Sequence, residues 1–279
     1  MQTDAAATPN APALAQPPAE AASAKLATAH LAKRYQLEVI RDLNLAVRPG
    51  AFYSILGPNG CGKTTLLRIL AGLERPTSGQ VLIDGEAVDL ARRTAHRVGL
   101  VFQEPRLLPW RTVEDNVRLC LRPLGVPEGE ARERAAYYLG LVGLHGFARY
   151  YPNRLSGGMQ QRASIARALA VEPDVLLMDE PFSALDAQNR RIMQDETAKL
   201  WQETGKTILF VTHSIAEAVR ISTEVAVLTA RPTTIRAVYA VGDHADTQAL
   251  EAELLRLLSE EVDRQRALDL ERSRAASPA

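Results

Sequence analysis

The sequence predicts an α/β fold with a mostly parallel core sheet, an antiparallel β region and a helical subdomain. Apolar strand-like segments alternate with helix-like segments through most of the chain, which is typical of a parallel sheet covered on both faces by helices. A glycine-rich motif follows the buried strand predicted at 51–56. Two carboxylates, Asp179 and Glu180, end the strand predicted at 174–178, where α/β proteins hold ligands.

Length and composition limit the possible classes. The chain has 279 residues, 46% of them hydrophobic, which allows one large domain or one domain with a subdomain at about 150 residues per domain. Lys plus Arg and Asp plus Glu are both 33, so the neutral balance gives no support for nucleic-acid binding by bulk charge. The two cysteines, Cys61 and Cys120, form no disulfide or zinc framework, which indicates a reducing compartment.

No apolar run approaches the roughly 20 residues that a membrane-spanning helix needs. Residues 1–24 are rich in Ala and Pro and lack the basic start and apolar core of a signal peptide. We expect them to form a disordered tail.

Short strands are expected on both sides of the central motif. Residues 26–47 predict two strands joined by a turn, with Tyr35 as an aromatic residue in this region. Residues 79–88 alternate and turn at Asp84-Gly85, as a β-hairpin does.

The central motif spans residues 57–65 (GPNGCGKTT) and fits the phosphate-loop pattern. Its glycines let backbone N–H groups point inward around a polyphosphate. Lys63 would reach the outer phosphates, and Thr64 would offer a hydroxyl to Mg²⁺. The helix predicted at 64–72 directs its positive end at the anion. The residues of this predicted site are Gly57, Pro58, Asn59, Gly60, Cys61, Gly62, Lys63, Thr64 and Thr65.

The middle of the chain predicts a strand at 97–102, followed by Gln103. The apolar segment 107–110 (LLPW) forms either a buried loop or a docking surface. At 155–162 (LSGGMQQR) a Ser-Gly pair opens a helix running to about Ala170, which is a second potential phosphate-binding terminus. Further helices are predicted at 112–121, 128–142, 189–203 and 215–220.

After the strand predicted at 207–212, which His213 follows, the pattern changes. Segments 225–229 and 234–241 predict an antiparallel pair. The helix predicted at 249–269 has a leucine stripe, expected to dock on its own domain. Its members are Leu250, Leu254, Leu257 and Leu258. The end, 272–279, is expected to be frayed. The expected units are a domain at 25–245, with a helical subdomain at about 105–168, and an extension at 246–279.

Taken together, these motifs resemble the nucleotide-binding subunit of ABC transporters over about residues 26–230. They occur in the order of that family: phosphate loop, Gln loop, signature, Walker B strand, D-loop and switch histidine. The matching positions after the phosphate loop are Gln103, 155–160, Asp179, Glu180, 183–186 and His213. The combination is far more specific than a phosphate loop alone.

The resemblance implies a role for each matching residue. Tyr35 would stack on the adenine of ATP. Thr64 and Gln103 would coordinate Mg²⁺, with Asp179 in its outer shell. Glu180 would act as general base on the attacking water, and His213 would contact the γ-phosphate. These roles agree with phosphoryl transfer, which depends on positioning and charge neutralisation.

The resemblance also implies partners. Ser156, Gly157 and Gly158 would close over ATP held by a second ATP-binding subunit in a head-to-tail dimer. A homodimer is expected, while a different partner cassette stays open. A separate permease would carry the pathway, with its coupling helix in a groove formed partly by 103–110. The subunit would sit peripherally on the cytoplasmic face of the inner membrane. An extracytoplasmic solute-binding protein would act indirectly, and no nucleic acid is expected.

Residues 102–110 (FQEPRLLPW), with 113 and 116–117, look like the nitrate, sulfonate and taurine importer branch. Sulfonate or taurine is the first choice of solute and nitrate the second, while cyanate and thiamine-precursor pyrimidines stay open. The main alternative is a soluble ABC ATPase acting on DNA, ribosomes or iron–sulfur assembly. A small-molecule kinase disagrees with the tandem carboxylates, and an exporter is a third alternative.

Overall fold

The fold was analysed in a computed structural model that describes residues 23–88, 97–242 and 247–276. The predicted tail, residues 1–24, therefore lies outside the described residues except for its last two positions. Ala24 is buried and packs with Leu82, a residue of the antiparallel sheet described below.

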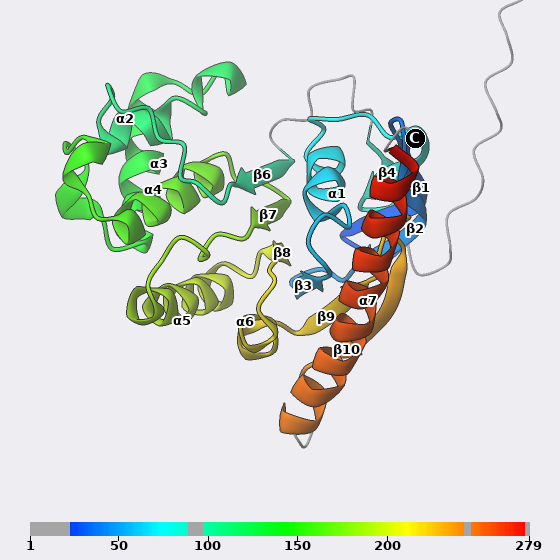
Figure 1. Ribbon diagram of the computed structural model, residues 1–279. Helices are drawn as coiled ribbons and strands as arrows, with labels where there is room; N and C mark the ends of the chain where they lie inside the picture. Colours follow the sequence, from blue (N-terminus) through cyan, green and yellow to red (C-terminus); the bar gives the residue numbers. More distant parts are fainter. Residues whose placement is uncertain (1–22, 89–96, 243–246, 277–279) are drawn as a thin grey trace, which may run out of the picture.

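The main sheet has six strands in the order β10-β9-β3-β8-β7-β6. Its members are β3 (Phe52–Leu56), β6 (Val98–Val101), β7 (Val175–Asp179), β8 (Thr207–Val211), β9 (Glu224–Leu228) and β10 (Ile235–Ala240). All pairs are parallel except β9 with β10. All residues of β3, β8 and β9 are buried, because helices and the second sheet cover both faces (Figure 1). The mostly parallel core is therefore confirmed.

The predicted antiparallel pair after residue 223 is present, and it belongs to the main sheet. β9 does pair with β10, but it also lies parallel to β3 and so belongs to the main sheet. Hydrophobic pattern alone could not reveal this neighbour, because β3 and β9 are far apart in sequence.

A second, antiparallel sheet has the order β2-β1-β4-β5. Its strands are β1 (Leu26–Arg34), β2 (Glu38–Val47), β4 (Ser78–Ile83) and β5 (Glu86–Ala87). Both predicted strand pairs at the start of the chain are present. One face of this sheet shares a core with α1 (Lys63–Leu70) and β3, so the helix after the phosphate loop is held between the two sheets.

Three helices, α2 (Val113–Arg118), α3 (Glu128–Leu141) and α4 (Gly157–Ala170), form a group beyond β6. They pack on one another around a common apolar cluster. The remaining core helices are α5 (Ala187–Thr204) and α6 (Ile215–Ile221), and single 3₁₀ turns occur at Arg122–Leu124, His145–Phe147 and Pro152–Arg154. Helix boundaries agree with the predictions within a few residues, while the subdomain limits at 105 and 168 stay a prediction.

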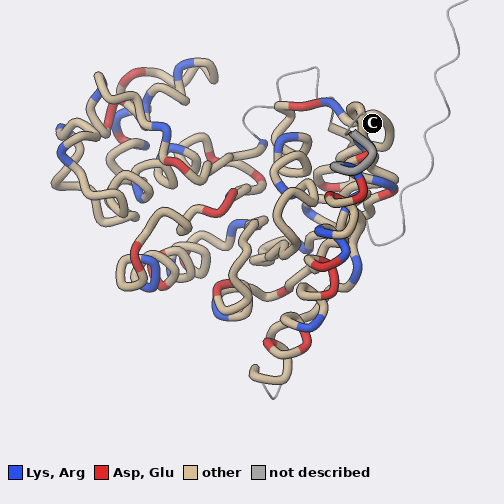
Figure 2. Tube along the Cα trace, viewed as in Figure 1, with Lys and Arg blue, Asp and Glu red and all other residues tan. Residues whose placement is uncertain are grey.

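The C-terminal helix α7 spans Thr247–Ala276. It docks on its own domain as expected, since Leu250, Leu254 and Leu257 are buried against α6 and β9. Acidic and basic residues alternate along the rest of its surface (Figure 2), and pairs such as Arg256–Glu260 support the helix. The predicted fraying from 272 was wrong as far as Ala276.

Among the described residues, no helix combines the length and the apolar character that crossing a membrane requires.

Candidate active site

The phosphate loop connects β3 to α1 and is shaped by glycine. Gly62, the residue before α1, has φ 127° and provides no side-chain cap, so the first N–H groups of the helix stay available to an anion. A Cβ on Gly62 would lie 2.9 Å from Cγ1 of Val39. Both the backbone conformation and the space therefore require glycine here.

Two side chains give the loop its charge and its packing. Lys63 is buried, and its Nζ donates to the carbonyl oxygens of Gly57 and Pro58 at 2.8 and 3.1 Å. Cys61 is fully buried in the core shared by the two sheets. Burial raises the pKa of its thiol, which supports a packing role rather than a nucleophilic one.

The two carboxylates lie where β7 ends. Asp179 is the last residue of β7, and Glu180 follows with φ 44°. The Glu180 N–H donates to the carbonyl of Val211 at 2.9 Å, because β7 and β8 are neighbours. Glu180 Oε2 lies 3.0 Å from Nδ1 of His213. The parallel pairing thus brings together a carboxylate and an imidazole that are 33 residues apart.

Asp179 faces Thr64 across the start of α1. Desolvation raises the pKa of the Asp179 carboxyl, the charge of Glu180 adds to the rise, and a hydrogen bond with Thr64 opposes it. A hydroxyl beside a carboxylate is an oxygen donor set that suits Mg²⁺. The described residues contain no group of three or more His, Cys, Asp or Glu side chains that could hold a metal ion. A bound Mg²⁺ would therefore need phosphate oxygens or water as further ligands.

A cavity of about 520 Å³ opens beside the phosphate loop. It is lined by Tyr35, Val39, Asn59, Gly60, Gly62, Lys63, Thr64, Thr65, Glu180 and Arg231. A neighbouring cavity of about 320 Å³ meets it at Thr64 and includes Asp179. Tyr35 is 51% exposed, and its ring lies under Nζ of Lys33 at 4.7 Å from the centroid. A half-exposed aromatic ring and the ammonium of Lys63 therefore line the same cavity.

Several predicted residues stand apart from this cavity. Gln103 is exposed after β6 and lines neither cavity. Ser156 caps α4, accepting a hydrogen bond from the N–H of Met159 at 3.3 Å. A Cβ on Gly158 would meet nothing within 4 Å. Within one chain, the structure does not bring the 156–158 segment to the phosphate loop.

Two lining residues were missed by the sequence reasoning. Val39 and Arg231 border the cavity, yet neither belongs to a recognisable motif. Arg231 was placed only in a turn between two strands. Its position depends on β9 lying beside β3, which no local pattern indicates.

A phosphate loop after one strand, with tandem carboxylates and a histidine at the ends of its neighbours, defines a nucleoside triphosphatase of the phosphate-loop class. Residues 40–183 match the family model described as ABC transporter. An uncharacterized ABC transporter ATP-binding protein of Methanocaldococcus jannaschii is 47% identical over 234 residues, covering 81% of this chain and 86% of the relative.

Relatives with a named solute are similarly close. A nitrate import ATP-binding protein of Synechocystis is 45% identical over 73% of this chain and 76% of its own length. A taurine import ATP-binding protein of Pseudomonas aeruginosa is 46% identical over 71% of this chain and 74% of its own length.

Solved structures agree with these relatives. An ATP-binding cassette solved as a dimer with ADP and Pi is 33% identical, with a TM-score of 0.68 over 78% of this chain and all of that one. The chain belongs to the ABC transporter family and is an ATPase cassette of that family.

Proposed function

We propose that this chain is the ATP-hydrolysing subunit of an ABC importer that takes up a small anion through a separate permease. The observation that carries the catalytic part is the Glu180–His213 contact at the edge of the phosphate-loop cavity. It places a carboxylate beside the loop, with an imidazole 3.0 Å away to orient it. Such a pair can position and deprotonate a water attacking the terminal phosphate.

The cavity accounts for ATP binding residue by residue. Lys63 and the N–H groups at the start of α1 bind the phosphates. Tyr35, which lines the same cavity, offers its half-exposed ring to the adenine. Thr64 and Asp179 would hold Mg²⁺, which neutralises charge on the phosphates when bound. Gln103 would join these ligands only after a change in the segment that follows β6, because it lies outside both cavities.

The segment Ser156–Gly158 acts on the nucleotide of a second chain in this proposal. Its exposure and its separation from the chain's own phosphate loop support that arrangement. The solved cassette cited above is a dimer with ADP and Pi. A ligand contacted by both chains favours the closed dimer, because it binds that state better than the open one.

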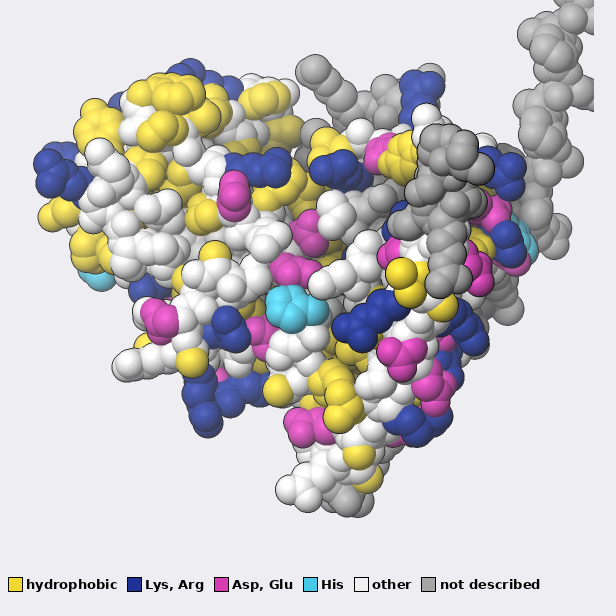
Figure 3. Space-filling view, in the orientation of Figure 1, with side chains coloured by type: hydrophobic (Ala, Val, Ile, Leu, Met, Phe, Trp, Pro, Cys, Tyr) yellow, Lys and Arg dark blue, Asp and Glu magenta, His cyan; other side chains and the backbone are white. Residues whose placement is uncertain are grey.

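The permease would dock on the loop 103–110, which we call the docking loop. Trp110 is 71% exposed, and Figure 3 shows hydrophobic side chains gathered over the part of the molecule that holds α2–α4. The buried amide of Asn116 fixes this loop, accepting from the N–H of Leu108 at 2.7 Å and donating to its carbonyl at 3.1 Å. The amide also donates to the carbonyl of Arg111 at 3.2 Å. The exposed indole is therefore presented by a rigid loop, as a docking surface requires.

Several of the relatives' names support an anion as solute without choosing one. Nitrate, taurine and aliphatic sulfonates are named among them, and so are Fe(3+) ions at comparable identity. We place aliphatic sulfonate or taurine first and nitrate second, with the subunit bound peripherally to the permease at the cytoplasmic face of the membrane.

Two experiments test this function. The tagged chain is pulled down from detergent-solubilised native membranes, and its partners are identified by mass spectrometry. Recovery of a multi-span permease is the expected result, and its associated solute-binding protein would be tested with taurine, alkyl sulfonates and nitrate. Recovery with cytosolic proteins alone would contradict the transport role.

The second experiment introduces a charge into the docking loop. We expect Trp110→Glu to abolish permease recovery and uptake while leaving the ATPase activity of the isolated chain intact. Tyr137→Glu is the control, because Tyr137 is 60% exposed on α3. Equal loss of uptake and isolated ATPase activity in Trp110→Glu would count against a docking role.

A further inference from the structure

The turn between β9 and β10, residues 229–234, lies against the phosphate loop. The hydroxyl of Thr233 donates to the carbonyl of Cys61 inside the loop, and the Thr233 N–H donates to the carbonyl of Val39 at 2.8 Å. Thr233 is only 1% exposed. The turn is therefore packed on the nucleotide cavity rather than projecting into solvent.

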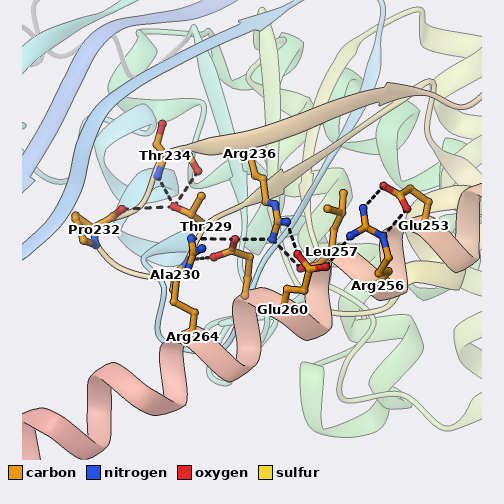
Figure 4. Close-up of polar contacts among 11 residues, drawn as sticks. Thr229, Ala230, Pro232, Thr234, Arg236, Glu253, Arg256, Leu257, Glu260 and Arg264 are labelled. Atoms are coloured by element: carbon orange, nitrogen blue, oxygen red, sulfur yellow. Dashed lines mark hydrogen bonds and ion pairs between the residues drawn. The ribbon is translucent and has the colours of Figure 1, made fainter.

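Helix α7 holds this turn from the other side. Buried Glu261 accepts a hydrogen bond from the Ala230 N–H at 2.8 Å, and buried Gln265 accepts one from the Arg231 N–H at 3.0 Å. Arg236 of β10 pairs with Glu261 at 2.6 Å, which leaves the buried carboxylate with a cationic partner. Figure 4 shows Ala230 of the turn and Arg236 of β10 facing α7, with Arg236 paired to Glu260. Two successive backbone N–H groups of the turn are thus fixed by one helix.

The Arg231 side chain reaches the cavity from this support. It lines the cavity beside the phosphate loop, and its Nη2 would lie 3.4 Å from a Cβ on Gly60. Its charge also opposes the rise in the pKa of Cys61, as the charge of Lys63 does. Two cations therefore flank the same short loop.

The guanidinium retains hydrogen-bonding capacity. Among the described residues, its Nε is buried without a hydrogen-bond partner, and Nη2 meets Asp269 at 3.6 Å. That distance is too long for a strong charge-assisted hydrogen bond. The planar fork of arginine matches phosphate oxygens bidentately, in a way that the single ammonium of Lys63 does not.

We propose that Arg231 is a further nucleotide-binding residue, whose guanidinium pairs with phosphate oxygens of the nucleotide on the phosphate loop while α7 holds its backbone in place. The inference rests on the proposed binding of ATP and adds a cationic contact from outside the loop. It also gives the C-terminal helix a part in nucleotide affinity.

The test measures binding to the full chain without hydrolysis. A fluorescent ADP derivative reports occupancy, and ATP and inorganic tripolyphosphate compete for the site in the presence of Mg²⁺. We expect Arg231→Gln to weaken ATP and tripolyphosphate alike by roughly tenfold or more, the value of one charge-assisted hydrogen bond. Arg231→Lys should lie between this variant and the unmodified chain.

Arg266→Gln is the matched control, because Arg266 is an exposed arginine on α7 whose pair with Asp263 is 3.9 Å long. It should bind both competitors as the unmodified chain does. Thermal unfolding of each variant shows whether the fold is kept, and Arg231→Lys tests the contact if Arg231→Gln unfolds.

Unchanged affinity in both Arg231 variants would overturn the inference while leaving the ATP site intact. Weaker ATP binding with unchanged tripolyphosphate binding would also overturn it, because the contact would then lie with the nucleoside. Failure of the unmodified chain to bind any probe would instead contradict the proposed function itself.

Discussion

Two helices of this protein begin at glycine-rich segments, and their surroundings differ sharply. The start of α1 is enclosed: a side chain on Gly62 would collide with Val39, Lys63 is buried, and the Thr233 hydroxyl donates to the carbonyl of Cys61 in the loop. The start of α4 is open: Ser156 is exposed and Gly158 would admit a side chain without contact. Similar local sequences therefore give an enclosed helix start at α1 and an exposed one at α4. In the proposed function, the exposed start of α4 contacts the nucleotide of a second chain.

The largest expected effect is a loss of ATP hydrolysis, without loss of ATP binding, at the enclosed cavity beside the phosphate loop. Glu180→Gln should lower ATP turnover roughly 100-fold or more, because a general base contributes about that factor. ATP affinity should be unchanged. Size-exclusion chromatography with ATP should show a trapped dimer, in which the start of α1 of one chain faces the start of α4 of the other. An active Glu180→Gln enzyme would remove Glu180 from the role of base. Glu203→Gln, on α5, is the control.

The next effect is a loss of ATP affinity at the phosphate loop. Lys63→Ala should weaken ATP binding about 10- to 100-fold, since a hydrogen bond to a charged group contributes about 1.5–3 kcal/mol. Titration calorimetry measures this directly, and Lys199→Ala on the exposed face of α5 should change nothing. Unchanged ATP affinity in Lys63→Ala would mean that the phosphate loop before α1 is not a working phosphate site.

A substitution at the exposed start of α4 should have the reverse effect: hydrolysis should fall while ATP binding by the monomer is unchanged. Ser156→Asp keeps a good N-cap for α4 but places a negative charge where the partner's phosphate would lie. We expect ATP binding by the monomer to be unchanged and hydrolysis to fall roughly tenfold or more. Thr112→Ala, which removes the cap of α2, should leave hydrolysis intact. Weaker binding by monomeric Ser156→Asp would break the contrast between the two helix starts.

The smallest effect is on stability, and it has opposite signs at the two glycines. Gly62→Ala should lower the free energy of unfolding by about 1–3 kcal/mol, because its φ of 127° strains any side chain. Gly158→Ala should raise it by about 0.5 kcal/mol, since alanine favours a helix and nothing obstructs its Cβ. Urea titration measures both. Equal destabilisation would show that the start of α4 is packed as tightly as that of α1.

Local patterns predicted the strand β3 and the helix α1 on either side of the phosphate loop, because this motif carries its strand and helix within one short stretch. The contact of Glu180 with His213 follows from parallel neighbours, whose ends meet at one sheet edge. Arg231 escaped prediction, because its place depends on β9 joining β3 across the whole domain. The separation of Ser156 from the cavity was anticipated only through the family resemblance. The residues alone could not predict it, because a glycine-rich helix start has the same sequence pattern whether it binds a ligand of its own chain or of another.

The final residues of α7 show a second limit. The leucine stripe ends before residue 269, which suggested fraying, yet the helix continues to Ala276. Charged pairs such as Arg272 with Asp269, at 3.7 Å, accompany this extension. Apolar periodicity predicts the part of a helix that packs on the core. It does not predict the part that is stabilised by ion pairs within the helix.

The clamped docking loop has a mechanical consequence. Arg167, near the end of α4, donates to the carbonyl oxygens of Pro105 and Arg106 at 2.7 and 2.8 Å. Ser156 is the N-cap at the other end of this helix, about 16 Å from Arg167 at 1.5 Å per residue. The docking loop, Asn116 and α4 are therefore connected by hydrogen bonds into one unit, from which Trp110 projects. In the proposed dimer, a movement of Trp110 would therefore be transmitted along α4 to Ser156 and so to the nucleotide of the second chain.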